Sequence, residues 1–149
     1  MMQEFLIHGG LFLNALAAGS ILPVQSEALL AGLLLTGHGN IWLLLIVATL
    51  GNTAGAAINW FLGGRLETYK DRRWFPATPE KLAKAEIFYK KFGRWTLLMS
   101  WVPVAGDALT VIAGIFKEKF WIFVIIVGLG KALRYIALAV ITLGVANLI

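Results

Sequence analysis

Four ionisable residues lie within apolar segments of the chain: two acids, Glu27 and Asp107, and two bases, Lys131 and Arg134. A charged side chain at the centre of a bilayer costs at least ~2.5 kcal/mol, so these groups should pair with one another or line a polar cavity. The bases could attract an anionic headgroup, and the acids could bind and release a proton. The alternative is that the four residues form structural salt bridges and nothing more.

Helical geometry gives the depth of these groups. Lys131 lies 11 residues beyond Phe120, or ~16 Å at about 1.5 Å per residue, near the middle of a ~30 Å hydrocarbon core. Asn52 lies equally deep in another segment, 11 residues beyond Ile41. We therefore predict a polar site at mid-membrane, with these substrate or proton candidates: Glu27, Asp107, Lys131, Arg134 and Asn52.

Five apolar segments must position these residues, and they differ in length. They cover residues 5–18, 21–36, 41–62, 95–116 and 120–149. A single crossing needs about 20 helical residues, so only 41–62 and 120–149 are comfortable membrane-spanning helices. Pro23 and Pro103 interrupt the second and fourth segments, and with Gly106 they are expected to set the bends of two hairpins.

The composition excludes most soluble functions. Of the 149 residues, 59% are hydrophobic and 14% are charged, and the mean hydropathy is +0.79, too little charge to coat a soluble domain. The chain has no cysteine, and its two histidines, His8 and His38, are far apart. We therefore predict no metal site and no cofactor, although a proton gradient could drive the protein. The sequence has no phosphate loop, nucleophile elbow or metalloprotease motif, so we also predict no catalytic residue.

The net charge of +5 comes from one block of the chain. Residues 65–94 hold nine Lys and Arg against four acids, while residues 1–64 hold no Lys or Arg. Under the positive-inside rule, 65–94 is predicted to be a cytoplasmic linker that touches anionic lipids and not a nucleic-acid-binding face. Within it, Thr78-Pro79 marks the start of a short amphipathic helix, whose apolar stripe includes Ala85 and Phe88 and whose lysines lie mostly elsewhere.

An internal repeat relates the two halves of the chain. Pro23, Val24, Glu27, Ala28 and Leu29 match Pro103, Val104, Asp107, Ala108 and Leu109 at an offset of 80, and Gly51-Asn52 matches Gly130-Lys131 at an offset of 79. Each repeat, about 5–64 and about 95–149, would be a re-entrant helical hairpin followed by one spanning helix. Basic residues flank only the second hairpin, so the hairpins should enter from opposite faces, as in many secondary transporters. The predicted fold is an all-α membrane protein with a single transmembrane domain, 1–149.

These residues resemble the DedA-type membrane proteins, also called the VTT or SNARE-associated family, and their small YqaA-like branch. The resemblance covers most of the chain and rests on Leu22-Pro23 through Glu27, Gly51 through Gly55, Ser100 through Asp107 closing at Ala113-Gly114, and Gly130 through Tyr135. It implies a multi-pass inner-membrane protein with paired re-entrant hairpins. It also implies a role in moving polyprenyl phosphate or phospholipids across the bilayer, with dependence on the proton motive force and a contribution to envelope integrity.

We predict a transporter-like membrane protein, not an enzyme, that flips or scrambles an anionic lipid or small anion across the bacterial inner membrane in a step linked to the proton motive force. Membrane lipids are the expected partners, nucleic acid is not, and the chain could form a homo-oligomer. Two alternatives stay open: a non-transporting scaffold with structural salt bridges, and an exporter of small ions or drugs. The first 20 residues carry Glu4 but no Lys or Arg, which disfavours a cleaved signal peptide.

Overall fold

The computed structural model describes residues 1–20, 25–65, 79–102 and 105–149, apart from the side chain of Leu82. Most of the described residues are helical, and no strand occurs among them. The elements are α1 (Met2–Gly19), α2 (Ser26–Leu35), α3 (Ile41–Gly64), α5 (Pro79–Phe92), the 3₁₀ helix η1 (Gly93–Trp101), α6 (Ala105–Ile115) and α7 (Phe120–Ala146). The prediction of an all-α protein is confirmed for these residues. Pro23 and Pro103, predicted to bend two hairpins, lie outside the described residues, as does Thr78.

Two helices, α3 and α7, are long and apolar enough to cross a membrane, in the positions predicted. Their 24 and 27 residues correspond to lengths of about 36 and 40 Å, more than the ~30 Å of a hydrocarbon core. Helix α3 begins at Ile41 because the Asn40 side chain accepts hydrogen bonds from the backbone N–H groups of Trp42 and Leu43, at 2.9 and 3.3 Å. This N-cap satisfies two N–H groups that have no partner within the helix.

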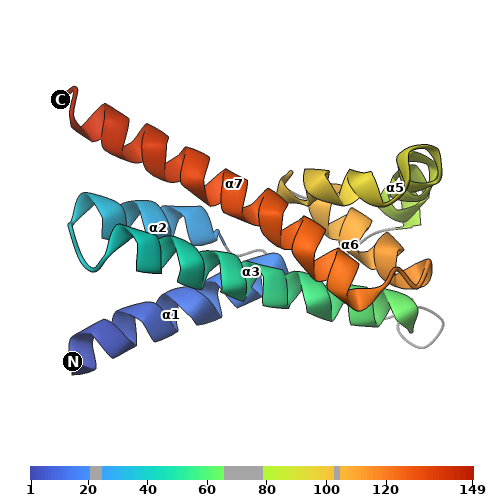
Figure 1. The fold of residues 1–149 in the computed structure, drawn as a ribbon, viewed down its shortest axis with the longest axis horizontal. Coiled ribbons are helices and arrows are strands. Elements are labelled where there is room, and N and C mark those ends of the chain that lie inside the picture. The colour runs from blue at the N-terminus through green and yellow to red at the C-terminus, as the bar shows by residue number, and fades with distance from the viewer. Residues whose placement is uncertain (21–24, 66–78, 103–104) are drawn as a thin grey trace.

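The remaining apolar segments form two pairs of shorter helices at opposite ends of the molecule. Helices α1 and α2 lie at the end that holds both termini, and α5, η1 and α6 lie at the other end (Figure 1). Within each pair the first helix ends and the second begins close to the middle of the molecule, α1 and α2 in one pair and η1 and α6 in the other (Figure 1). These two breaks are called the interruptions of the helix pairs. The segment predicted as 95–116 begins not as an α-helix but within the 3₁₀ helix η1, whose nine residues, 93–101, are many for this type of helix.

The packing of these pairs on the long helices follows one pattern in both halves of the chain. Helix α3 packs against α1, the first member of its own pair, and against α6, the second member of the other pair. Helix α7 likewise packs against η1, the first member of its own pair, and against α2, the second member of the other. Each half of the chain therefore completes the packing of the other half.

Glycines permit the close approach of these helices. A Cβ atom on Gly55 would lie 2.3 Å from the carbonyl oxygen of Leu16 in α1, and one on Gly63 would lie 2.0 Å from that of Val111 in α6. On α7, a Cβ atom on Gly130 would lie 2.9 Å from the carbonyl oxygen of Leu98 in η1. Small residues at such contacts are typical of helices that associate in membranes, where backbone packing and not water exclusion supplies the attraction.

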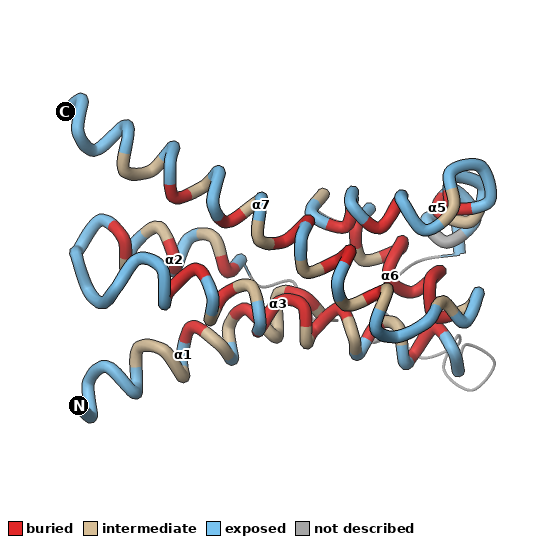
Figure 2. Tube along the Cα trace, viewed as in Figure 1, coloured by how far each residue is buried: buried red, intermediate tan, exposed pale blue. Residues whose placement is uncertain are grey.

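The outer surface of the helices is far more apolar than that of a soluble protein, while the apolar interior also holds several polar side chains. On α7, large apolar side chains point outward along one stripe, namely Trp121, Ile125, Leu129, Leu133 and Val140. Polar side chains are buried inside, among them Ser26, Asn52, Asn59 and Lys131. Figure 2 shows the buried positions concentrated where helices meet, with the exposed ones on the outer faces. Such an outer surface is suited to lipid.

A small polar cluster attaches α5 to the turn between α6 and α7. The Tyr89 hydroxyl donates a hydrogen bond of 2.6 Å to the Glu118 carboxylate, which also pairs with Arg94 at 3.4 Å. Burial of the phenol, together with this hydrogen bond, raises the pKa of Tyr89 well above its usual range. The phenol therefore stays protonated and keeps its donor role. The Tyr89 ring also stacks on Phe116, with centroids 5.2 Å apart.

Replacing Tyr89 with phenylalanine should detach this end of α5 while keeping the ring contact. We expect a loss of about 1.5–3 kcal/mol, because a hydrogen bond to a charged acceptor is lost and the Glu118 carboxylate is left partly unsatisfied. Thermal unfolding of the full chain in detergent, followed by circular dichroism, measures the loss. Glu118→Gln, whose amide oxygen can still accept from Tyr89, should cost less. An unfolding temperature unchanged by Tyr89→Phe would contradict the assignment.

Candidate functional site

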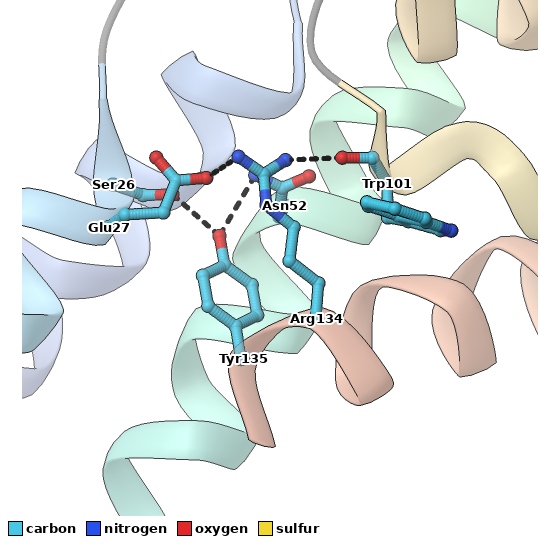
Figure 3. A network of polar contacts seen from close by, with 6 residues as sticks. All are labelled: Ser26, Glu27, Asn52, Trp101, Arg134 and Tyr135. Carbon is cyan, nitrogen blue, oxygen red and sulfur yellow. Dashed lines mark hydrogen bonds and ion pairs between the residues drawn. The ribbon is translucent and has the colours of Figure 1, made fainter. Parts of the chain in front are cut away.

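The candidate site lies where the start of α2 and the end of η1 come together at the middle of α7 (Figure 3). Arg134 on α7 forms an ion pair with Glu27, the second residue of α2. Its other terminal nitrogen donates a hydrogen bond of 2.8 Å to the backbone carbonyl of Trp101, the last residue of η1. The Glu27 and Arg134 side chains are 27% and 23% exposed, so the pair is only partly shielded. The Arg134 guanidinium therefore links the start of α2 to the end of η1.

A second set of contacts lies beside this ion pair. The Tyr135 and Ser26 hydroxyls are hydrogen-bonded at 2.6 Å, and the Asn52 amide donates to the Tyr135 hydroxyl at 3.0 Å (Figure 3). All three side chains are buried. The carbonyl oxygen of the Asn52 amide has no hydrogen-bond partner among the described residues. A buried acceptor without a partner is uncommon in proteins, and the site therefore has capacity for one more donor.

The two remaining candidates, Asp107 and Lys131, interact with each other. Asp107 lies in the first turn of α6 and experiences the charges of Lys131 on α7 and of Lys81 on α5. Lys131 is only 3% exposed. The sequence allowed Glu27 to meet either Lys131 or Arg134, and the structure places it on Arg134. The four charges therefore divide into an ion pair between α2 and α7 and an electrostatic interaction between α6 and α7 for which no ion pair is found among the described residues.

Asn59 on α3 connects the two helix pairs a second time. Its amide donates to the carbonyl of Gly19, at the end of α1, at 3.3 Å, and to the Thr110 hydroxyl of α6 at 3.2 Å. Thr110 in turn donates to the carbonyl of Asp107 at 2.7 Å. Each long helix therefore carries one polar residue that contacts both helix pairs, Asn59 on α3 and Arg134 on α7.

Gly106, a candidate for hairpin geometry, lies at a close contact. A Cβ atom there would lie 2.1 Å from the carbonyl oxygen of Ser100, and the Gly106 N–H donates to the carbonyl of Val102 at 2.8 Å. The backbone of α6 can therefore begin directly beside the end of η1 only because residue 106 has no side chain.

Sequence reasoning missed three members of this site: Ser26, Tyr135 and the Trp101 carbonyl. Ser26 and Tyr135 directly precede and follow the charged residues Glu27 and Arg134, so a search for polar neighbours of the charges would have found them. The Trp101 carbonyl carries no signal in the sequence, because every residue has a carbonyl group and only the end of η1 leaves this one available.

Comparison with known proteins places this architecture in a family. Residues 22–143 match the VTT domain, a span that includes α2, α3, α6, all but the last three residues of α7 and all five candidate residues of the polar site. The chain belongs to the VTT-domain family. The resemblance to DedA-type proteins inferred from the motifs is thereby confirmed.

The chain is also similar to several bacterial proteins with curated names. The inner membrane protein YqaA of Escherichia coli is 37% identical over 141 residues, which cover 95% of this chain and 94% of that protein. A Staphylococcus aureus protein named undecaprenyl phosphate transporter A is 29% identical over 126 residues, 76% of this chain and 62% of that protein. A Lactococcus lactis protein named alkaline phosphatase-like is 29% identical over 136 residues, 83% of this chain and 63% of that protein. No solved structure matches the chain.

This VTT-domain protein is accordingly a bacterial inner-membrane protein, as predicted. The localisation follows from the named YqaA relatives together with the two helices long enough to span a bilayer.

Proposed function

We propose that this VTT-domain protein moves an anionic lipid or a similar small anion across the inner membrane, in a step linked to the proton gradient. The observation that carries the proposal is the position of Arg134, which binds the interruptions of both helix pairs at once. A headgroup that competes with Glu27 or with the Trp101 carbonyl for this guanidinium would loosen one helix pair from the other. Ligand binding and a change in helix arrangement are thereby coupled.

The two helix pairs are proposed to be re-entrant hairpins of an inverted repeat, with repeat 1 at about 5–64, a cytoplasmic linker at 65–94 and repeat 2 at about 95–149. Helices α2, η1 and α6 have 10, 9 and 11 residues, or about 15, 18 and 16 Å, close to half of a ~30 Å core. Helix α1, with 18 residues, is longer, at about 27 Å. The reciprocal packing of the pairs on α3 and α7 supports the repeat. Irregular backbone at this depth is tolerated only inside protein or beside water, so the proposal requires the ends of α1, α2, η1 and α6 to face protein or a water-filled cavity and not lipid.

The residues of the site have separate proposed roles. Arg134 and Lys131 would attract the anion. Glu27 and Asp107 would take up or release a proton when the anion binds to these basic residues. The unpartnered Asn52 carbonyl oxygen would accept a hydrogen bond from a headgroup hydroxyl or from water. None of these roles requires a covalent step, which fits a protein that is not an enzyme. The S. aureus relative named as a transporter supports movement of a lipid phosphate.

The test uses the full chain in sealed vesicles that contain a fluorescent anionic phospholipid, with the label bleached from outside. We expect label movement faster than in empty vesicles, and faster again under an imposed pH gradient. Asp107→Asn should remove the acceleration by the gradient, because the amide cannot exchange a proton, and should leave gradient-independent movement in place.

Glu86→Gln is the matched control, because Glu86 lies on α5 in an exposed pair with Lys90. It should keep the gradient response. Movement equal to that of empty vesicles, for anionic and zwitterionic labels alike, would refute transport of lipid. If Asp107→Asn responds to the pH gradient as strongly as the wild type does, Asp107 does not couple lipid movement to the gradient.

The scaffold alternative also has an observation in its favour. Glu27 and Arg134 already satisfy each other, as a structural salt bridge would. A transport site and a scaffold predict different results when the charges of Glu27 and Arg134 are exchanged.

A further inference from the structure

A cavity of about 460 Å³ lies outside the polar site, between α5, η1 and α6. Its walls are apolar and include Phe88 of α5, Met99 of η1 and Leu109 of α6. Phe88 and Met99 are 38% and 42% exposed. The volume lies within the range of about 300–1,000 Å³ that is typical of sites for small ligands. Side chains of the described residues leave it unfilled.

Two lysines also line this cavity, Lys81 and Lys84 of α5. Lys81 lies four residues before Ala85, and Lys84 lies four residues before Phe88, which places all four on one helical face. The lysines were predicted to lie mostly away from the apolar stripe, and for these two the prediction was wrong. The reason is that α5 packs on α6 and η1, and the face turned toward them carries both the apolar residues and the two ammonium groups.

The two lysines differ in their surroundings. Lys81 acts electrostatically on Asp107 in the first turn of α6. Lys84 is exposed, and among the described residues no acid forms an ion pair with it. An ammonium group beside an apolar cavity is complementary to a ligand with an anionic head and an apolar tail.

We propose that this cavity binds one anionic phospholipid of the inner membrane, with an acyl chain against Phe88, Met99 and Leu109 and the phosphate at Lys84. A phospholipid is the occupant that the observations favour, because this is an inner-membrane protein and the cavity opens beside an amphipathic helix with basic residues. The lipid need not cross the membrane to occupy this site. The inference therefore extends the proposed function to a second lipid contact but does not depend on transport.

Binding is measured on the full chain in detergent by native mass spectrometry, titrated with phosphatidylglycerol and with phosphatidylcholine of the same acyl chains. We expect phosphatidylglycerol to bind several-fold more tightly. Lys84→Gln should weaken its binding about five-fold, the contribution typical of one basic residue at an anionic surface. Ala105 also lines the cavity. Ala105→Leu should weaken the binding of both lipids, because the larger side chain would fill space that the acyl chain occupies.

Lys90→Gln is the matched control, since Lys90 lies on the same helix and pairs with Glu86 but does not line the cavity. It should bind phosphatidylglycerol like the wild type. Equal losses in Lys84→Gln and Lys90→Gln would show general attraction to a basic helix and overturn the site. Ala105→Leu without effect, or competition by glycerol 3-phosphate as strong as by the whole lipid, would show that no chain enters the cavity. Because this experiment measures binding and not translocation, a negative result would reject the lipid site in the cavity without deciding whether the protein transports lipid.

Discussion

Arg134→Gln should abolish lipid movement in vesicles and destabilise the protein by about 2–3 kcal/mol. The substitution removes the ion pair with Glu27 and the charged hydrogen bond to Trp101. Loss of one partner from a fully buried pair costs ~3–5 kcal/mol, and the partial exposure of these side chains reduces the cost. Glu27 would be left without its cation, and the interruptions of the two helix pairs would lose their common contact.

The matched control for Arg134→Gln is Arg65→Gln. Arg65 directly follows α3, 13 residues beyond Asn52, and packs over the Phe61 ring at 4.3 Å and not on a residue of the polar site. It should keep transport and lose little stability. Full lipid movement by Arg134→Gln, in protein shown to be folded, would contradict a role for Arg134 in the site.

Exchanging the two charges separates a transport site from a scaffold. The double variant Glu27→Arg with Arg134→Glu restores opposite charges across the same gap. If the pair is only structural, the exchange should recover the unfolding temperature and also the envelope phenotype of a deletion strain. If Arg134 binds the anion, stability should return in part while lipid movement stays absent, because the cation then sits on α2 and no longer contacts the Trp101 carbonyl. Recovery of lipid movement would therefore show that these two charges only hold the helices together and that Arg134 does not bind the anion.

Gly63→Ala should destabilise the contact of α3 with α6 by at least about 1–3 kcal/mol, the usual cost of overpacking. The new Cβ atom would lie 2.0 Å from the Val111 carbonyl oxygen, and a backbone atom cannot rotate away as a side chain can. In a protein of this size the loss corresponds to a fall of roughly 2–4 °C in the unfolding temperature per kcal/mol. Circular dichroism in detergent would record it.

The neighbouring glycine supplies the control. Among the described residues, a Cβ atom on Gly64 meets only the Gly114 carbonyl oxygen, at 3.6 Å, an ordinary contact. Alanine is the better helix former by up to about 1 kcal/mol, so Gly64→Ala should be neutral or slightly stabilising. Opposite signs at adjacent positions would identify the helix contact as the cause. Equal effects of the two substitutions would mean that α3 and α6 do not approach this closely.

The sequence by itself determined the features that depend on local pattern. The runs 41–62 and 120–149 predicted α3 and α7 because an uninterrupted apolar length is enough to specify a spanning helix. Glu27, Asp107, Lys131 and Arg134 were recognisable because charge is rare in such surroundings. The motifs from Leu22 to Glu27 and from Gly130 to Tyr135 were sufficient to indicate the VTT-domain family, which the comparison confirmed.

Only the tertiary structure decided which of these groups meet. Lys131 and Arg134 were equivalent partners for Glu27 in the sequence, since both lie on one helix within a single turn. The rotation of α7 against α2 and α6 places Arg134 in an ion pair with Glu27 and leaves Lys131 under the electrostatic influence of Asp107. Glycine contacts such as Gly63 with Val111 set how closely neighbouring helices lie. The Trp101 carbonyl joined the site only because η1 ends beside α7. Hydropathy and charge specify depth in the membrane, whereas partner choice depends on helix rotation and close packing, which no local pattern encodes.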